Sequence, residues 1–177
     1  MAEAFSNKVQ RAAGIVTSTT GGAIGVTTNL ITGISTVGIA VSDLVDNGNY
    51  ILGTKVTNIG VSSVTCDRDS TNTAAATNQS VKFLGVTTAY TSSAKSILVG
   101  GTFANNTSQS VNLTVQIYDN SVTTEVAIAG KIPVPNGSSF VISDAGKTVM
   151  EASDEIRIYC DTANAIDATL SILTGVS

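Results

Sequence analysis

The sequence predicts an all-β protein, namely a jelly-roll-like β-sandwich with a small inserted β-barrel-like module near its N-terminus. Short apolar segments alternate with turn-forming residues every 8–12 residues, a spacing typical of sandwiches and jelly rolls. No segment shows a convincing helical period. The phrase Ile-Gly-Val-Thr-Thr at residues 24–28 recurs as Leu-Gly-Val-Thr-Thr at residues 84–88. These two copies bracket a stretch whose removal leaves flanks that continue as one β-domain.

The repeated phrase therefore defines the expected domain organisation. We expect a discontinuous sandwich built from residues 1–19 and 86–177 and an inserted module at residues 20–85. Residues 1–8 are expected to form an N-terminal arm. The length of 177 residues accommodates one large domain or two small ones.

The first strand is expected at residues 9–19, with Gly21-Gly22 as the element that ends it. Within the inserted module, Asn47-Gly48 predicts a tight turn because both residues tolerate positive φ. Residues 67–79 form a polar loop without periodicity. The module's short strands are expected at residues 29–32, 39–41, 50–52, 55–59, 63–66 and 80–84.

The second part of the sandwich has clearer strands. Apolar and polar residues alternate at 111–118, 156–160 and 166–172, so each of these strands has one buried and one solvated face. Further strands are expected at 97–103, 122–129, 140–142 and 148–150. Pro133 and Pro135 indicate a turn or an edge, because proline cannot donate to a ladder. The predicted core residues are Leu113, Val115, Ile117, Ile156, Ile158, Leu170 and Ile172.

The composition argues against several classes of partner. Charged residues make up only 12% of the chain, the net charge is −4, and the basic residues form no stripe, so we expect no nucleic-acid partner. No run of residues is long and apolar enough for a membrane span, and the N-terminus lacks a signal pattern, so we expect no membrane association. Trp is absent and aromatic residues make up 5%, which disfavours a stacking platform for sugars or bases.

The two cysteines, Cys66 and Cys160, lie one in each expected module. Without a signal peptide, two buried free thiols are the leading interpretation, and a disulfide bridge or a reactive thiol remains the alternative.

The chain offers little catalytic chemistry. It contains no His, which removes the most common general base and metal ligand. Asp67-Arg68-Asp69 is interpreted as a solvated turn rather than a cation site, because it lacks the spacing of a calcium loop. Residues 151–155 carry three carboxylates that we expect to cap a turn before Ile156, and Asp161 and Asp167 are interpreted as turn residues. No catalytic, cofactor-binding or metal-binding residue is predicted, and no cofactor.

Two stretches resemble a module of tailed-phage virion proteins, especially those of marine cyanophages. They are residues 32–45, Thr-Gly-Ile-Ser-Thr-Val-Gly-Ile-Ala-Val-Ser-Asp-Leu-Val, and residues 53–59, Gly-Thr-Lys-Val-Thr-Asn-Ile. Ser42 stands where that module commonly has Gly. The N-terminal Met-Ala-Glu-Ala-Phe and the segments 115–119, 131–135, 151–157 and 168–173 also resemble small tailed-phage structural proteins.

The resemblance implies a non-enzymatic virion component assembled in the host cytoplasm. The leading hypothesis is a capsid decoration (cement) protein that forms a homo-oligomer, most often a trimer, and binds the major capsid protein or another virion protein. A neck, tail or baseplate component is the first alternative. A host receptor- or glycan-binding module is the second, and an enzyme the last.

Overall fold

The computed structural model of the chain describes residues 3–143 and 147–176. These residues contain fifteen β-strands and no helix, and all strand pairs are antiparallel. The chain divides into two compact units. Unit 1 comprises Met1–Gly14 and Thr87–Ser177, and unit 2 comprises Ile15–Val86.

The unit boundaries differ slightly from those expected. The chain leaves unit 1 after Gly14 rather than after Thr19, and it returns at Thr87 rather than at Val86. The predicted single strand at 9–19 is in fact two strands, β1 (Ala4–Ala13) and β2 (Ile15–Ile24), which belong to different units. Gly14 separates them with a φ of +125°, a conformation available essentially to glycine alone.

The expected N-terminal arm at 1–8 is also different in the structure. Residues 4–8 form the first half of β1 and pair with β15 (Ile166–Thr174), with Ala4 opposite Thr174 and Lys8 opposite Leu170. Met1 and Ala2 lie outside the described residues. The alternation rule missed this half-strand because both of its faces are largely exposed.

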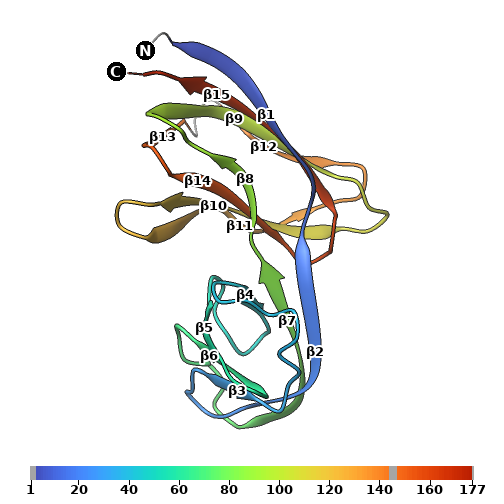
Figure 1. Cartoon of the computed structure of the whole chain (residues 1–177). Helices are drawn as coiled ribbons and strands as arrows, with labels where there is room; N and C mark the ends of the chain where they lie inside the picture. Colours follow the sequence, from blue (N-terminus) through green and yellow to red (C-terminus); the bar gives the residue numbers. More distant parts are fainter. Residues whose placement is uncertain (1–2, 144–146, 177) are drawn as a thin grey trace. The chain divides into compact units, whose positions relative to one another are not determined.

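Unit 1 contains two antiparallel sheets in a sandwich-like arrangement (Figure 1). The first, called here the β9 sheet, has the order β1, β15, β9 (Ser96–Asn105) and β12 (Ser139–Ile142), with β13 (Thr148–Met150) also pairing with β9. The second, called here the β10 sheet, has the order β11 (Thr124–Val134), β10 (Val111–Asp119), β14 (Glu155–Cys160) and β8 (Thr87–Thr91). Pro133 lies in β11, at an edge of its sheet, as proline's missing donor requires.

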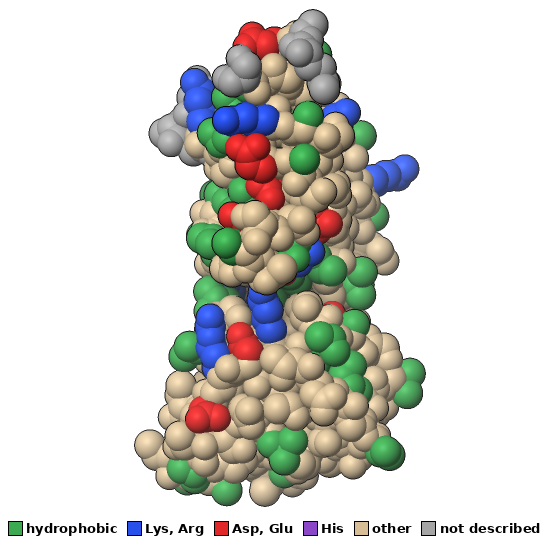
Figure 2. Space-filling view, turned by 60° about the vertical axis from the view of Figure 1, so that its left-hand side comes forward, with side chains coloured by type: hydrophobic (Ala, Val, Ile, Leu, Met, Phe, Trp, Pro, Cys, Tyr) green, Lys and Arg blue, Asp and Glu red, His purple; other side chains and the backbone are tan. Residues whose placement is uncertain are grey.

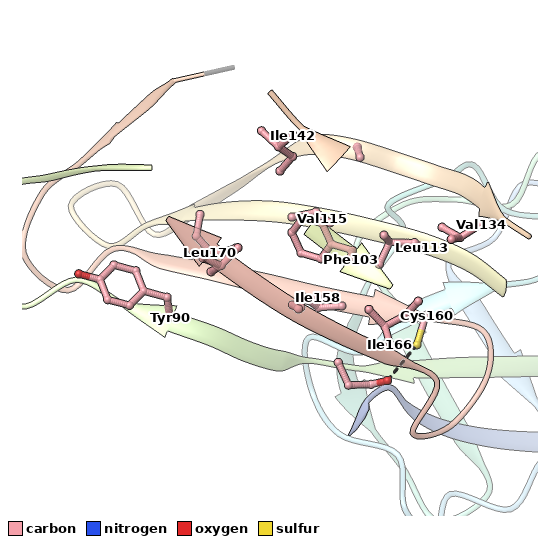
Figure 3. Packing of buried hydrophobic residues seen from close by; sticks show 14 of the residues in the cluster. Tyr90, Phe103, Leu113, Val115, Val134, Ile142, Ile158, Cys160, Ile166 and Leu170 are labelled. Carbon is pink, nitrogen blue, oxygen red and sulfur yellow. Dashed lines mark hydrogen bonds between the residues drawn. The ribbon is translucent and has the colours of Figure 1, made fainter. Parts of the chain in front are cut away.

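The core of unit 1 lies between these sheets, where side chains from both point toward one another (Figure 3). Phe103, Leu170 and Ile166 come from the β9 sheet, and Leu113 and Ile158 come from the β10 sheet. The predicted core is confirmed: six of its residues are fully buried, and Ile117 is partly buried against the same cluster. The alternation of β10, β14 and β15 thus identifies the inward faces correctly.

Unit 2 is a six-stranded sheet with a separate core. Its order is β4 (Leu44–Asp46), β7 (Ala76–Gly85), β2, β3 (Leu30–Thr32), β6 (Ser63–Cys66) and β5 (Val56–Ile59). Ile24, Ile31, Val64, Val81 and Phe83 are buried in its centre.

Within residues 15–86, all of which are described, strand pairing does not close this sheet into a barrel. Its two edges are joined by an isolated bridge between Leu44 and Lys55. Gly21 and Gly22 do not end a strand, because β2 continues past them through a register shift. Residues 39–41 and 50–52 lie in turns and irregular segments rather than in strands.

Candidate functional surfaces

A cluster of charged side chains lies on the outward side of the β10 sheet. Arg157 of β14 donates from Nε to Glu155 Oε2 at 2.7 Å, and its Nη1 forms an ion pair with Glu125 of β11. The guanidinium also lies 3.8 Å from the ring centroid of Tyr118. Thr88 Oγ1 donates to Glu155 Oε2 at 3.3 Å, so the cluster connects four neighbouring strands.

This cluster joins strands and does not form a site open to a ligand. The Glu125 side chain is only 4% exposed and the Arg157 side chain 16%, and each is matched by an opposite charge. Burial acts to lower the pKa of Arg157, but the hydrogen bond that it donates to Glu155 and the negative charges of Glu155 and Glu125 outweigh this and raise that pKa above its ordinary value. Beside Arg157 in the β10–β14 register, the buried Gln116 Oε1 has no hydrogen-bond partner among the described residues.

The acidic residues singled out from the sequence accept hydrogen bonds from backbone N–H groups of the fold. Asp154 is buried, and it accepts hydrogen bonds from the backbone N–H groups of Glu151 at 2.8 Å and Asn120 at 3.0 Å. The expectation that this segment caps the turn before β14 is therefore confirmed. Asp67 accepts from the Lys55 N–H at 2.8 Å and holds the loop that follows β6.

Asp161 and Asp167 also bind backbone groups. Asp161 accepts from the Asn112 N–H at 3.0 Å and from its side-chain amide at 2.8 Å, just after β14. Asp167 lies within β15, so its interpretation as a turn residue is wrong, and it accepts from the Ala12 N–H at 2.7 Å. Among residues 3–143 and 147–176, no group of three or more His, Cys, Asp or Glu side chains is arranged to hold a metal ion.

The tyrosines do not form an aromatic platform. Tyr50, Tyr90 and Tyr159 are buried, and Tyr118 lies against Arg157. Three of the four rings therefore present little surface to a sugar or a base.

The two thiols are buried and free, as the leading interpretation held. Cys160, which lies among the core residues of unit 1 (Figure 3), has its Sγ 3.0 Å from the Thr162 carbonyl and 3.4 Å from the Ala13 carbonyl. Cys66 belongs to the core of unit 2. Burial raises the pKa of both thiols to about 11. Both are therefore protonated at neutral pH.

The β9 sheet also has an apolar outer surface that was not predicted from the sequence. Phe5, Leu173, Ile97 and Val149 stand opposite one another in register across β1, β15, β9 and β13. They point away from the core, because their neighbours Ile172, Leu98 and Met150 are the buried ones. Phe5 is 64% exposed and Val149 56%. The sequence does contain a signal for this surface, the continuous apolar run Ile97-Leu98-Val99. A strand with apolar side chains on both faces is typically covered on both faces.

Unit 2 exposes hydrophobic side chains mainly on its loops. Val37 and Val61 are almost fully exposed in neighbouring loops that a hydrogen bond from Thr36 Oγ1 to the Val61 carbonyl connects. An open depression of about 300 Å³ is lined mostly by small and apolar residues, including Ala23, Leu30 and Ala76. In the view of Figure 2, charged side chains are few and hydrophobic side chains form small separate groups.

A comparison of the chain with known protein families, curated proteins and solved structures finds no match. Among the described residues, no helix is long and apolar enough to cross a membrane.

Proposed function

We propose that this chain is a non-enzymatic structural protein of a tailed-phage virion, and that it serves as a capsid decoration protein. The observation that supports this most is the strand order of unit 1. With β12 and β13 counted as one interrupted strand, the unit has eight strands, whose sheets read 1-8-3-6 and 2-7-4-5 in chain order.

We propose that this order makes unit 1 a jelly roll. The pairs β1–β15, β8–β14, β9–β12 and β10–β11 are all antiparallel, as if one long hairpin had been rolled up. Jelly rolls recur in viral capsid and lectin domains, so the proposed topology agrees with a place in a virion. Fold alone does not determine function, and the phage resemblance of residues 32–45 and 53–59 supplies the second argument.

Unit 2 is an insertion between the first two strands of this proposed jelly roll. We propose that it is barrel-like, because the Leu44–Lys55 bridge joins the edges of its sheet. Its exposed apolar loops at Val37 and Val61 make it the proposed contact piece toward another virion protein.

The decoration role also fits the weakly charged surface, because charged residues are depleted from the centres of protein interfaces. Only 12% of the residues are charged. A decoration protein of this kind would bind the major capsid protein and self-associate, and the resemblance implies a trimer as the most common state.

The copy number in purified particles tests this proposal. Quantitative mass spectrometry should give a ratio to the major shell protein near one or a simple fraction such as one third. A ratio of a few per cent would instead identify a neck, tail or baseplate component. Absence from particles would reject the virion role, and binding on a glycan array would then support the receptor-binding alternative.

A further inference from the structure

From the different surroundings of its two Asn-Gly pairs we infer that this chain has a site of spontaneous deamidation at Asn136, and that Asn47 is protected from the same reaction. Deamidation converts a neutral side-chain amide to a carboxylate, with water as the only co-reactant. At Asn136 it would make the chain's net charge of −4 more negative by one unit. This inference concerns the chain in solution and does not rest on the virion role.

The reaction is least hindered where glycine follows asparagine, because glycine has no Cβ beside its backbone nitrogen. The Gly137 nitrogen attacks Asn136 Cγ and loses its proton, and the side-chain nitrogen leaves with that proton as ammonia. The product is a cyclic succinimide. Water then adds to one of the two ring carbonyl carbons and breaks the bond from that carbon to the Gly137 nitrogen. Cleavage at Cγ gives aspartate, and cleavage at the main-chain carbon gives isoaspartate.

Asn136 lies in an open turn between β11 and β12. The Ser138 N–H donates to the Pro135 carbonyl at 3.1 Å, which places Asn136 and Gly137 at the two central turn positions. Both residues are exposed, and no hydrogen bond within residues 3–143 and 147–176 holds the Asn136 side chain. A Cβ at Gly137 would meet nothing within 4 Å, and an open depression of about 330 Å³ adjoins the turn. The Asn136 amide is therefore free to turn toward the Gly137 nitrogen, and water reaches both.

Asn47 is also followed by glycine, but its side chain is held in place. It is half-buried, and its Nδ2 donates to the Ser80 carbonyl at 2.9 Å. Its Oδ1 accepts from the Asn49 N–H at 2.9 Å and from the Asn49 side-chain amide at 3.0 Å. Gly48 is as open as Gly137, because a Cβ there would also meet nothing within 4 Å. The two pairs thus differ in the restraint on the asparagine side chain rather than in the space around the glycine.

The turn that contains Asn136 is anchored at both ends to the buried Asn105 of β9. Asn105 Nδ2 donates to the Val134 carbonyl at 2.8 Å, and the Asn105 N–H donates to the Ser138 carbonyl at 2.9 Å. Aspartate at position 136 leaves the backbone path between these anchors unchanged. Isoaspartate adds one atom to that path, because its backbone runs through Cγ. Isoaspartate should therefore disturb an anchoring hydrogen bond to a buried side chain and lower the stability of unit 1.

Peptide mapping of the full chain tests the inference. Folded protein is incubated at a mildly alkaline pH and body temperature, and mass spectrometry follows the replacement of amide by carboxylate at each Asn-Gly pair. Because loss of one hydrogen bond shifts a conformational equilibrium several-fold, we expect Asn136 to react at least about tenfold faster than Asn47. In denaturant the two should react at similar rates, because the restraint on Asn47 is lost.

The matched variants are Asn136→Gln and Asn47→Gln, since the extra methylene of glutamine slows ring closure. Asn136→Gln should abolish the modification at position 136, and Asn47→Gln should leave the rate at Asn136 unchanged. Circular dichroism before and after incubation confirms that each chain stays folded. A stable Asn136, or equal rates at Asn136 and Asn47 in the folded chain, would overturn the inference.

A thermal melt tests the consequence for the turn. The isoaspartate form, separated from aged protein by ion exchange, should melt at a lower temperature than the variant Asn136→Asp, which carries the same charge. Equal melting temperatures would show that the two hydrogen bonds of Asn105 do not fix the length of this turn.

Discussion

Single residues on the inward side of β14 hold the two sheets of unit 1 together. Ile158 is fully buried and stands opposite Val115 of β10 in the centre of the core. Such positions were predictable from sequence, because successive side chains of a strand point to opposite faces of the sheet. Strict alternation of apolar and polar residues therefore indicates a strand with one face buried in the core.

Truncation of Ile158 tests this packing. We expect Ile158→Ala to lower the free energy of unfolding by about 2–5 kcal/mol, since it removes buried methyl groups and leaves a cavity. The measurement is chemical denaturation, with Val126→Ala at a 60% exposed position of β11 as the control. A loss below about 1 kcal/mol would contradict the assigned facing of β14.

The buried thiols give a prediction that depends on pH. Because the pKa of Cys66 and Cys160 is about 11 rather than the ordinary 9.0, the reactive thiolate is scarcer in the folded chain. At pH 8 alkylation by iodoacetamide should be at least roughly 100-fold slower in the native protein than in the unfolded protein, and it should accelerate as pH rises toward 11.

The number of labelled thiols per chain, measured by mass spectrometry, checks this expectation. Rapid native labelling at pH 8 would show that one thiol is accessible and would revive the reactive-thiol alternative. Labelling in denaturant provides the reference for both cysteines.

At the scale of elements, edge strands were the hardest to predict. The first half of β1 contributes nothing buried, so its sequence shows no alternation and resembles a free arm. This segment is a strand only because it pairs with β15, which lies more than 150 residues away in the sequence. In unit 2 the short strands pair with partners distant in sequence, and local patterns therefore misplaced residues 39–41 and 50–52. The polar cluster around Arg157 could not be predicted for the same reason, because its members come together only where four strands lie side by side.

The break between β1 and β2 depends on Gly14. A Cβ at this position would press on the Thr162 carbonyl and lie 2.5 Å from Cys160 Sγ, and its φ is one that other residues avoid. We expect Gly14→Ala to cost about 2–4 kcal/mol, from backbone strain and overpacking together.

The matched control for this variant is Gly137→Ala. Gly137 also has a positive φ, of 66°, but a Cβ there would meet nothing within 4 Å. We expect a cost of about 1 kcal/mol, from strain alone. Equal losses of thermal stability in the two variants would show that the contacts around Gly14 are unimportant.

At the scale of the whole molecule, each unit has its own sheets and its own core. The two points where the chain passes between units are close together within unit 1, because the Gly14 N–H donates to Thr87 Oγ1 at 3.3 Å. The insertion was predictable from the repeated phrase, whereas its boundaries were not, because β2 and β7 continue the strand pattern to the edge of unit 2.

Deletion of residues 15–86, with Gly14 joined directly to Thr87, tests the independence of unit 1. We expect a folded sandwich with a cooperative thermal transition, since both sheets and their core remain complete. Circular dichroism and calorimetry measure this. An unfolded product would show that the two units form one interdependent domain.

The pairing of β1 with β15 has a consequence for synthesis on the ribosome. The first strand must wait for the last one, so unit 1 cannot complete its sheet until nearly the whole chain has emerged. Unit 2 can fold as soon as residue 86 is available. At about 5–20 residues per second, the remaining residues take roughly 5–20 s, during which the nascent chain carries one finished unit and one unpartnered strand.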